Sequence, residues 1–167
     1  MASITEAKES PAQQLWEQVN TVHAGMLGVD GADLHMQPMA PNADPKTNTI
    51  WFYTKSDAEI VRAIKSGARA HFILVGKDHD YHASLAGKIE VRNDASKVDE
   101  YWSSVVAAWY EGGKKDPKLT MLALHVDDAE IWVSTGSKVK FGWEIAKANL
   151  DDEKMPDVGV KRHLQFA

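Results

Sequence analysis

Short segments rich in β-branched and aromatic residues, with turn residues between them, constrain the fold of this chain of 167 residues more than any other feature. The densest is residues 49–54 (TIWFYT), which contain no strand breaker. Two more follow one another at residues 69–75 and 81–91. Because strands joined by short turns pair in the antiparallel sense, this order predicts a mainly antiparallel sheet and not a doubly wound parallel one.

Two hairpins complete the expected sheet. One turns at Asp30-Gly31 and the other, near the end of the chain, at Asp127-Asp128. The strands expected in these hairpins are residues 26–30, 33–40, 119–126 and 130–134. About six or seven strands with short turns are typical of a barrel, so the pattern predicts an α+β barrel.

Four further segments carry apolar residues at helical spacing. The first begins at Ser10-Pro11, where an N-cap residue precedes a proline at the first helical position. The expected helices are residues 11–25, 56–66, 94–109 and 137–150, the last with Ser137 as its N-cap. We expect a single domain over residues 1–167, with residues 1–10 a disordered tail and residues 151–167 a C-terminal tail.

Composition excludes several kinds of chemistry and partner. The chain has no cysteine, which excludes disulfides, thiolate catalysis and iron–sulfur clusters. Its net charge of −5 and its scattered lysines and arginines argue against a nucleic-acid partner. It has neither a signal-peptide start nor an apolar run of about 20 residues, so we expect a cytoplasmic protein with no membrane partner.

The titratable residues form no recognisable catalytic or metal-binding motif. Phosphate-loop, dinucleotide-binding, hydrolase and zincin motifs do not occur. His79 and His82 are the closest pair of the seven histidines, but their spacing puts them on opposite faces of an extended segment. We therefore predict no metal site and name no catalytic residue. Among six tryptophans, Trp109 precedes the break at Gly112-Gly113 and is a candidate to border a planar ligand.

Residues 34–54 (LHMQPMAPNADPKTNTIWFYT) resemble two barrel strands and their connecting loop in the general stress proteins of the pyridoxamine 5′-phosphate oxidase-like split-barrel class. Pro38-Met39 matches the end of the first strand in that family, and residues 50–54 match the second strand, which closes in a threonine. Further matches follow in consistent order at residues 86–91, 102–113 and 129–139.

The resemblance implies an α+β fold: a mainly antiparallel, six-stranded split β-barrel with flanking helices, paired as a homodimer. It also implies flavin mononucleotide (FMN) at the dimer interface and, with it, a weak flavin-dependent oxidoreductase activity. Most contacts would come from one subunit, and Trp109 would come from its partner. The implied cofactor-binding residues are His35, Met36, Gln37, Pro38, Phe52, Tyr53, Thr54, Lys55, Ser56 and Trp109.

The chain departs from this family at the positions that would hold the FMN phosphate. Flavin-binding relatives have an arginine near the positions of His35 and Gln37. They also have a serine and a lysine where this chain, aligned without a gap, has Ala58 and Ile60. The nearby groups that could replace these residues are Lys55, Ser56, Arg62 and Lys65, while Asp57 and Glu59 would oppose a phosphate.

Three hypotheses for function therefore stay open. The first is an FMN-binding general stress protein with weak oxidoreductase activity. The second is a non-enzymatic split-barrel protein that holds another aromatic ligand in its dimer cleft. The third is a haem-handling role for His35 or another histidine. Pyridoxamine 5′-phosphate oxidase activity itself is not expected, because the likeness to that enzyme is at the level of the fold.

Overall fold

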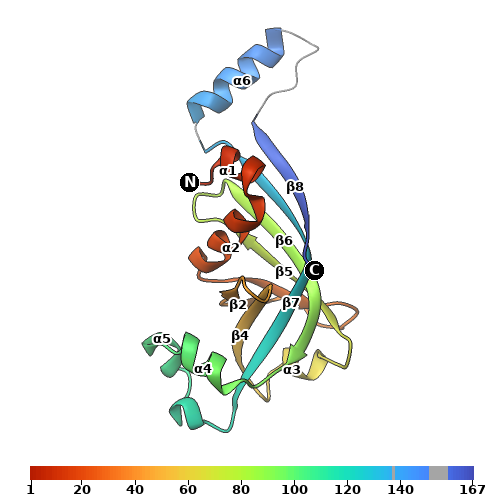
Figure 1. Cartoon of the computed structure of the whole chain (residues 1–167), viewed down its shortest axis with the longest axis vertical. Helices are drawn as coiled ribbons and strands as arrows, with labels where there is room; N and C mark the ends of the chain where they lie inside the picture. The colour runs from red at the N-terminus through yellow and green to blue at the C-terminus, as the bar shows by residue number, and fades with distance from the viewer. Residues whose placement is uncertain (137, 151–157) are drawn as a thin grey trace.

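The computed structural model describes residues 1–136, 138–150 and 158–167, and its described strands form one antiparallel sheet (Figure 1). The strands are β1 (Gly25–Val29), β2 (Gln37–Met39), β3 (Asn42–Asp44), β4 (Thr49–Lys55), β5 (Arg69–Val75), β6 (Tyr81–Val91), β7 (Leu119–Ser134) and β8 (Gly159–Gln165). The helices are α1 (Ile4–Glu9), α2 (Pro11–Thr21), α3 (Glu59–Ala63), α4 (Ala95–Tyr101), α5 (Ser104–Ala107) and α6 (Lys138–Leu150), with a 3₁₀ turn at Gly113–Lys115.

The order of the strands makes the sheet curl into a barrel. Neighbouring strands run β2-β1-β5-β6-β7-β4-β3, and β8 pairs with the far half of β7. The two end strands, β2 and β3, are joined by only Ala40 and Pro41, so three Cα–Cα steps keep them within about 11 Å of each other. Among the described residues no ladder joins β2 to β3, and the barrel therefore stays open along this line, which we call the seam.

The α+β split-barrel fold predicted from the resemblance is confirmed. Six of the described strands have five residues or more, and β2 and β3 add three residues each. Figure 1 shows α1 and α2 against one side of the sheet, with α4 and α5 beside the lower end of β4.

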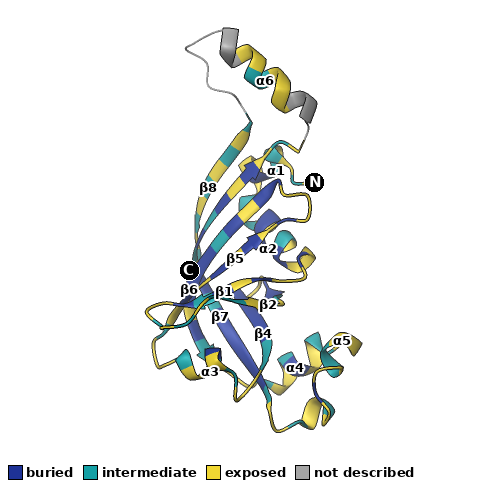
Figure 2. Cartoon of the chain, turned by 180° about the vertical axis from the view of Figure 1, so that it is seen from behind, coloured by how far each residue is buried: buried dark blue, intermediate teal, exposed yellow. Residues whose placement is uncertain are grey.

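The main core lies inside the curl of the sheet. The residues of β5 alternate between exposed and buried, as expected for a strand with one face on a core (Figure 2). Phe72 from this strand packs against Phe52 of β4, with ring centroids 5.2 Å apart. Leu15 and Val19 of α2 close the core from the helical side, and both are fully buried.

A second, smaller apolar cluster lies on the opposite face of β4 and β7. Trp51, Met121 and Ala123 are buried there beneath Val98 of α4. The first four residues of β4 are therefore all buried, because the main core covers one face of the strand and this second cluster covers the other. This arrangement fixes α4 beside the end of β4, close to the seam.

The hairpin predicted at Asp127-Asp128 is wrong, because β7 continues through both residues as one strand of 16 residues. Opposite them, Ala86 pairs with Asp128 and Gly87 pairs with Val126, which leaves Asp127 as the extra residue of a β-bulge. Only glycine fits at position 87, since a Cβ there would lie 1.9 Å from the carbonyl oxygen of His125. The acidic pair therefore marks a bulge and not a turn.

Several predicted element boundaries change in the structure. The predicted helix 94–109 is interrupted at Trp102, and Ser103 starts α5 by accepting a hydrogen bond from the Val106 amide. The predicted helix 56–66 is reduced to the five residues of α3. The hairpin at Asp30-Gly31 does pair β1 with β2, although a longer loop separates them.

Both predicted tails contain regular structure. Residues 1–10 include α1, which is capped by Ser3 and packs through the fully buried Ala7, so they are not a disordered tail. The C-terminal segment includes β8, which pairs with β7 from Asp128 to Ser134. Residues 151–157 and the predicted cap Ser137 lie outside the described residues.

Candidate functional site

A groove of about 1030 Å³ follows the seam, at the upper end of the range for pockets that hold a small molecule. One wall is the connection from Pro38 to Asn42, which joins β2 to β3. A second wall is the end of β4, at Tyr53, Thr54 and Lys55. The third wall comes from α4, α5 and the residues that follow α5. The remaining lining residues are Val22, His23, Asp57, Ala58, Tyr101, Ser103, Val105, Val106, Trp109 and Tyr110.

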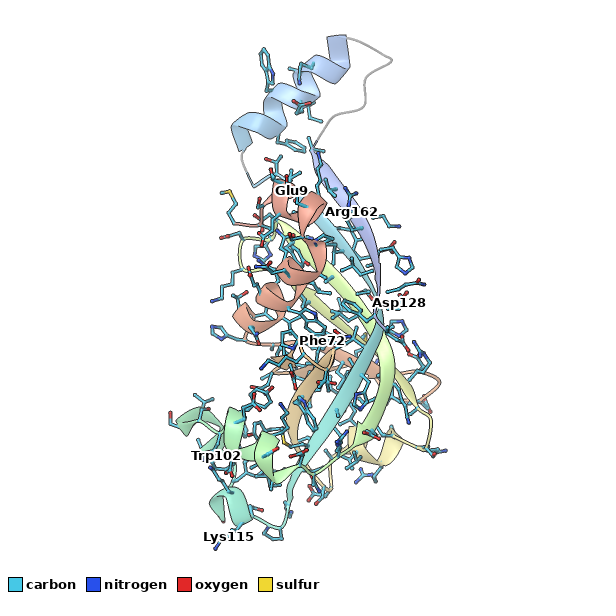
Figure 3. The ribbon with its side chains drawn as sticks, in the orientation of Figure 1. Glu9, Phe72, Trp102, Lys115, Asp128 and Arg162 are labelled. Atoms are coloured by element: carbon cyan, nitrogen blue, oxygen red, sulfur yellow. The ribbon has the colours of Figure 1, made fainter. Side chains whose placement is uncertain are left out.

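Three aromatic side chains, Tyr53, Trp102 and Tyr110, form a cluster that holds the helical wall against β4. The ring centroid of Tyr53 lies 6.2 Å from that of Trp102 and 6.5 Å from that of Tyr110. Trp102 and Tyr110 are themselves 6.2 Å apart. Figure 3 labels Trp102 beside α4 and Phe72 within the main core. Contacts of this kind stabilise aromatic pairs beyond the area that they bury.

Two tyrosine hydroxyls of this aromatic cluster donate hydrogen bonds to backbone carbonyls across the groove walls. Tyr53 donates to Val98 O of α4 over 2.7 Å, and Tyr110 donates to Thr54 O of β4, also over 2.7 Å. Burial raises the pKa of both tyrosines to about 12, and for Tyr53 the neighbouring Tyr110 adds to the shift. At neutral pH both hydroxyls are therefore donors and neither is a base.

Charge in the groove is sparse. Lys55 is the one lysine or arginine among its described lining residues, and no ion pair is formed by its ammonium group in the described chain. Asp57 is the one carboxylate, and it accepts a hydrogen bond from Lys118 Nζ over 2.7 Å. That contact lowers the pKa of the Asp57 carboxyl and offsets its negative charge. A ligand in the groove therefore meets mostly apolar and aromatic surface.

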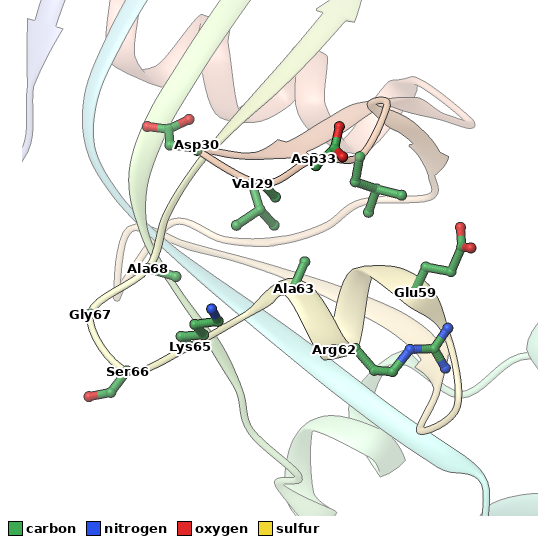
Figure 4. Close-up of a pocket in the computed structure, with 13 residues that line it drawn as sticks. Val29, Asp30, Asp33, Glu59, Arg62, Ala63, Lys65, Ser66, Gly67 and Ala68 are labelled. Carbon is green, nitrogen blue, oxygen red and sulfur yellow. The ribbon is translucent and has the colours of Figure 1, made fainter.

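A second cavity, of about 580 Å³, lies between α3 and the β1–β2 loop, and we call it the α3 cavity (Figure 4). It contains two cations, Arg62 and Lys65, together with the carboxylates of Asp30, Asp33 and Glu59. Figure 4 shows Arg62 near Glu59 at one end of the cavity and Lys65 toward the other. Of the cations considered above as substitutes for phosphate-binding residues, Arg62 and Lys65 thus line this polar cavity, and Lys55 lines the groove.

The groove brings together five of the ten residues implied as cofactor contacts: Pro38, Tyr53, Thr54, Lys55 and Trp109. The resemblance implied that Trp109 reaches the ligand of a partner subunit, whereas here it lines the groove of its own chain. The other five, His35, Met36, Gln37, Phe52 and Ser56, are not among the lining residues.

Phe52 faces the main core instead of the groove. It is fully buried against Phe72, because successive residues of a strand point to opposite faces and Tyr53 takes the groove side. Met36 packs over Gly28, where an added Cβ would lie 2.8 Å from Met36 Cγ. His35 is exposed, and its position outside the groove lining gives no support to a haem-handling role there.

Position 60 cannot present a cation to the groove. Ile60 is 1% exposed and belongs to the main core. Of the two positions that depart from the family pattern in this segment, only Ala58 lines the groove. It is also the N-cap of α3, which begins at Glu59 rather than at Ser56 or Asp57.

The sequence prediction missed most of the seam and of the helical wall. His23 follows α2, and the stretch from Met39 to Asn42 connects two strands that the sequence does not show to be neighbours. Tyr101 and Val105 lie in the expected helix 94–109, where their helical spacing predicts that they face the core. The sequence feature that could have located the seam is the pair Pro38 and Pro41. A proline cannot donate a hydrogen bond to a neighbouring strand, so prolines indicate the edge of a sheet.

Comparison with known proteins assigns the family. A family model described as pyridoxamine 5′-phosphate oxidase like matches residues 10–157. The chain belongs to this family. General stress protein 26 of Bacillus subtilis (strain 168) is 30% identical over 101 residues, which are 58% of this chain and 70% of that protein.

Two solved structures of this family share the fold at similar identity. A crystal structure assigned to general stress protein 26 from Jannaschia sp. CCS1 is 32% identical, with a TM-score of 0.78, over 96% of this chain and 99% of that chain. The general stress FMN/FAD binding protein from Xanthomonas citri is 36% identical, with a TM-score of 0.70, over 78% and 92% of the two chains. The resemblance to the general stress proteins is thereby confirmed.

Two further structural findings concern metals and membranes. In the described part of the chain, no three histidine, aspartate or glutamate side chains gather closely enough to hold a metal ion. No helix formed by the described residues is both long and apolar enough to cross a membrane.

Proposed function

We propose that this chain binds a flavin in the groove at the seam of its barrel. The observation that supports this most directly is the groove itself: a large, mainly apolar cleft where Pro38, Tyr53 and Trp109 come together from separate elements. Clefts of this composition, with a few polar groups, are typical of cofactor sites. The Xanthomonas citri relative described as an FMN/FAD binding protein supports the same ligand class.

The residues of the groove fit the ring system of a flavin. A planar apolar ring needs a flat hydrophobic wall, which Pro38, Met39 and Val106 provide, and an aromatic neighbour, which Trp109 provides. The phosphate of FMN needs positive charge or amide donors, and Lys55 offers one ammonium group. We therefore assign the ring to the apolar walls and the phosphate to the end of β4.

A bound flavin would supply the electron-transfer chemistry of a weak oxidoreductase. The contribution of the chain is to bind and orient the ring and to exclude water from it. Tyr53 and Tyr110 keep their protons and hold the walls together through Val98 O and Thr54 O. Neither can act as a base, so we assign no proton-transfer step to these two tyrosines.

We also propose that two copies of the chain pair over the exposed apolar face of the sheet. Met26, Ile73 and Val75 are 40–43% exposed on this face, and Trp132, 40% exposed, lies on the same face beyond His82; exposed apolar side chains gathered on one face mark an interaction site. Met26 lies opposite Ile73 on one side and opposite Pro38 on the other. The face thus reaches the groove through Pro38, and a symmetric partner there would cover the open side of the bound ring.

The test is a titration of the purified protein into FMN, followed by flavin fluorescence and visible absorbance, with sedimentation velocity run on the same samples. We expect saturable binding at one site per chain, quenching of the flavin fluorescence by the nearby aromatic rings, and a dimer in sedimentation. The proposal fails if FMN at about 100 µM, well above the dissociation constants of typical cofactor sites, produces no spectral change.

A second function has one observation in its favour. The burial of Ile60 removes a position where relatives place a cation, which weakens the case for a phosphorylated ligand. A non-enzymatic protein that holds another aromatic molecule in the groove would show no FMN binding in the same titration, although a planar aromatic dye would still bind.

A further inference from the structure

The distribution of positive charge around the groove is unusual for a site that holds a phosphate ester. A phosphate monoester carries close to two negative charges at neutral pH, and proteins hold it with several cationic or amide donors. Among the described residues that line the groove there is no arginine, and Lys55 is the one lysine. A phosphate in this groove would therefore meet a single ammonium group.

The ammonium group of Lys55 attracts an anion only weakly, because it is exposed to solvent and has acidic neighbours. The pKa of the Asp57 carboxyl is lowered first by Lys118 and also by Lys55. Hydrogen bonds from the amides of Lys118 and Gly112 lower the pKa of Asp116, and the charge of Lys55 adds to that effect. Lys55 thus already lies in the field of two carboxylates, and solvent screens what remains of its attraction for an anion.

The other cations of this region are directed elsewhere. Arg62 Nη1 donates a hydrogen bond to the backbone carbonyl of Asp57 over 2.7 Å, and Arg62 lines the α3 cavity beside Glu59. Lys65 lines that same cavity. Lys118 Nζ forms an ion pair with Asp57 Oδ2 over 2.7 Å. None of these three side chains is among the described residues that line the groove.

The walls that would hold the ring, in contrast, are extensive. Pro38, Met39 and Val106 supply apolar contacts, and Tyr110 fixes the helical wall through its hydrogen bond to Thr54 O. Trp109 is 69% exposed in the free chain and so has most of its ring available to a ligand. The contacts available to the ring therefore outnumber those available to the phosphate.

We infer, resting on the proposed flavin function, that the groove recognises its flavin by the ring system and accepts riboflavin nearly as well as FMN. Lys55, the one lysine or arginine among the described lining residues, is the cation that discriminates between them. Exposed ion pairs contribute little, so the dissociation constant for riboflavin is expected within about tenfold of that for FMN. A site with several charged donors would separate the two ligands far more strongly.

The test is a parallel titration of the whole chain with riboflavin and with FMN, at low and at high salt, followed by quenching of flavin fluorescence. We expect the tenfold limit to hold at low salt and the two affinities to converge at high salt, since salt screens the contribution of Lys55. Lys55→Gln should weaken FMN binding to the level of riboflavin and leave riboflavin unchanged. The matched control, Lys65→Gln, removes a cation of the α3 cavity and should change neither affinity.

A gain-of-function variant completes the test. Ala58→Lys places a second cation at the groove and should tighten FMN binding severalfold without affecting riboflavin, with circular dichroism used to verify the fold. FMN binding at low salt that is tighter than riboflavin binding by clearly more than about tenfold in the native chain overturns the inference and leaves the flavin function standing. So does an FMN preference that survives Lys55→Gln. Binding of neither flavin overturns the proposed function, and the inference with it.

Discussion

The seam groove and the α3 cavity lie close together in the chain but differ in how they are built. The groove is bounded by segments from Val22 to Tyr110, so it exists only once the sheet has curled and α4 has docked. The α3 cavity lies between two short stretches, residues 29–34 and 59–68. The groove is larger and mainly apolar, while the α3 cavity contains five charged side chains.

The difference places the two things that a nucleotide cofactor needs, an apolar wall for its ring and cations for its phosphate, in different cavities. The apolar wall for a ring forms at the seam, because β2 and β3 leave the barrel open there. The cations that a phosphate would need, Arg62 and Lys65, lie in the other cavity among carboxylates. The chain therefore has a good site for a planar ring and a poor one for a phosphate, and each prediction below tests that separation.

The largest effect is expected from Tyr110→Ala. Tyr110 is 6% exposed, contacts both other members of the aromatic cluster and donates to Thr54 O. Loss of a buried aromatic ring should lower the free energy of unfolding by about 3 kcal/mol, measured by urea denaturation. Flavin binding should fall by at least about tenfold, because the helical wall loses its attachment to β4.

The matched change in the α3 cavity is Arg62→Ala. Its guanidinium group is exposed and makes a hydrogen bond to Asp57 O. Flavin affinity should stay within about twofold of the native value, as for a surface substitution away from the site. An equal loss of flavin binding in the two variants would contradict the assignment of the ligand to the groove.

The next effect is expected from Trp109→Ala, which removes an aromatic ring without removing core packing. Flavin affinity should fall by roughly three- to tenfold, the range for one aromatic contact. The melting temperature should not change, since Trp109 is 69% exposed. Trp143→Ala on α6 is the control, because Trp143 is 65% exposed and lies outside the groove lining. If both variants bind flavin like the native chain, the tryptophan does not border the ligand.

The comparison between the two cavities also predicts that the stability of the folded chain falls at alkaline pH. The effect arises at the groove, because tyrosines are among its lining residues and none is among those of the α3 cavity. Burial raises the pKa of Tyr53 and Tyr110 to about 12, whereas an unfolded tyrosine has a pKa of about 10. Above pH 10 the unfolded chain releases protons that the folded chain keeps, so stability is full below pH 10 and falls between about 10 and 12.

Two measurements check this dependence. Absorbance near 295 nm should show little tyrosinate in the folded protein at pH 10, and urea denaturation should show the loss of stability above it. Tyr53→Phe should make that loss less steep. Tyrosinate appearing in the folded protein with a midpoint at pH 10 would show that the hydroxyls of the aromatic cluster are exposed.

The smallest effect is expected from Lys118→Met, which leaves Asp57 without its partner. An unpaired carboxylate at the edge of the groove should weaken FMN binding by about two- to fourfold, as expected for exposed charges, and should leave riboflavin binding unchanged. Equal changes for the two ligands would show that Lys118 supports the groove by packing rather than by charge.

The parts of the fold that depend on local pattern were predictable from the sequence. The predicted strands 69–75 and 81–91 have the bounds of β5 and β6, since period-two burial is visible in the residues themselves. The bulge at Asp127 was not predictable, because it depends on Gly87 in the neighbouring strand. An acidic pair alone has the appearance of a turn.

The site divides in the same way. Tyr53, Thr54 and Lys55 were implied as cofactor contacts by the family resemblance, and all three line the groove. The resemblance implied Phe52 as well, but the alternation of side chains along a strand turns Phe52 to the core when Tyr53 faces the groove. The contribution of the seam and of residues such as His23 could not be predicted, because it depends on which strands end up at the two edges of the sheet.

The most direct test of the central claim is to map riboflavin binding on the ¹H–¹⁵N NMR spectrum of the chain. The account predicts that the largest shifts occur at the amides of Met39, Ala40 and Asn42 and at the indole of Trp109, with Gly31 and Gly67 in the α3 cavity unchanged. Shifts concentrated at Gly31 and Gly67, or spread without preference between the two cavities, would contradict it.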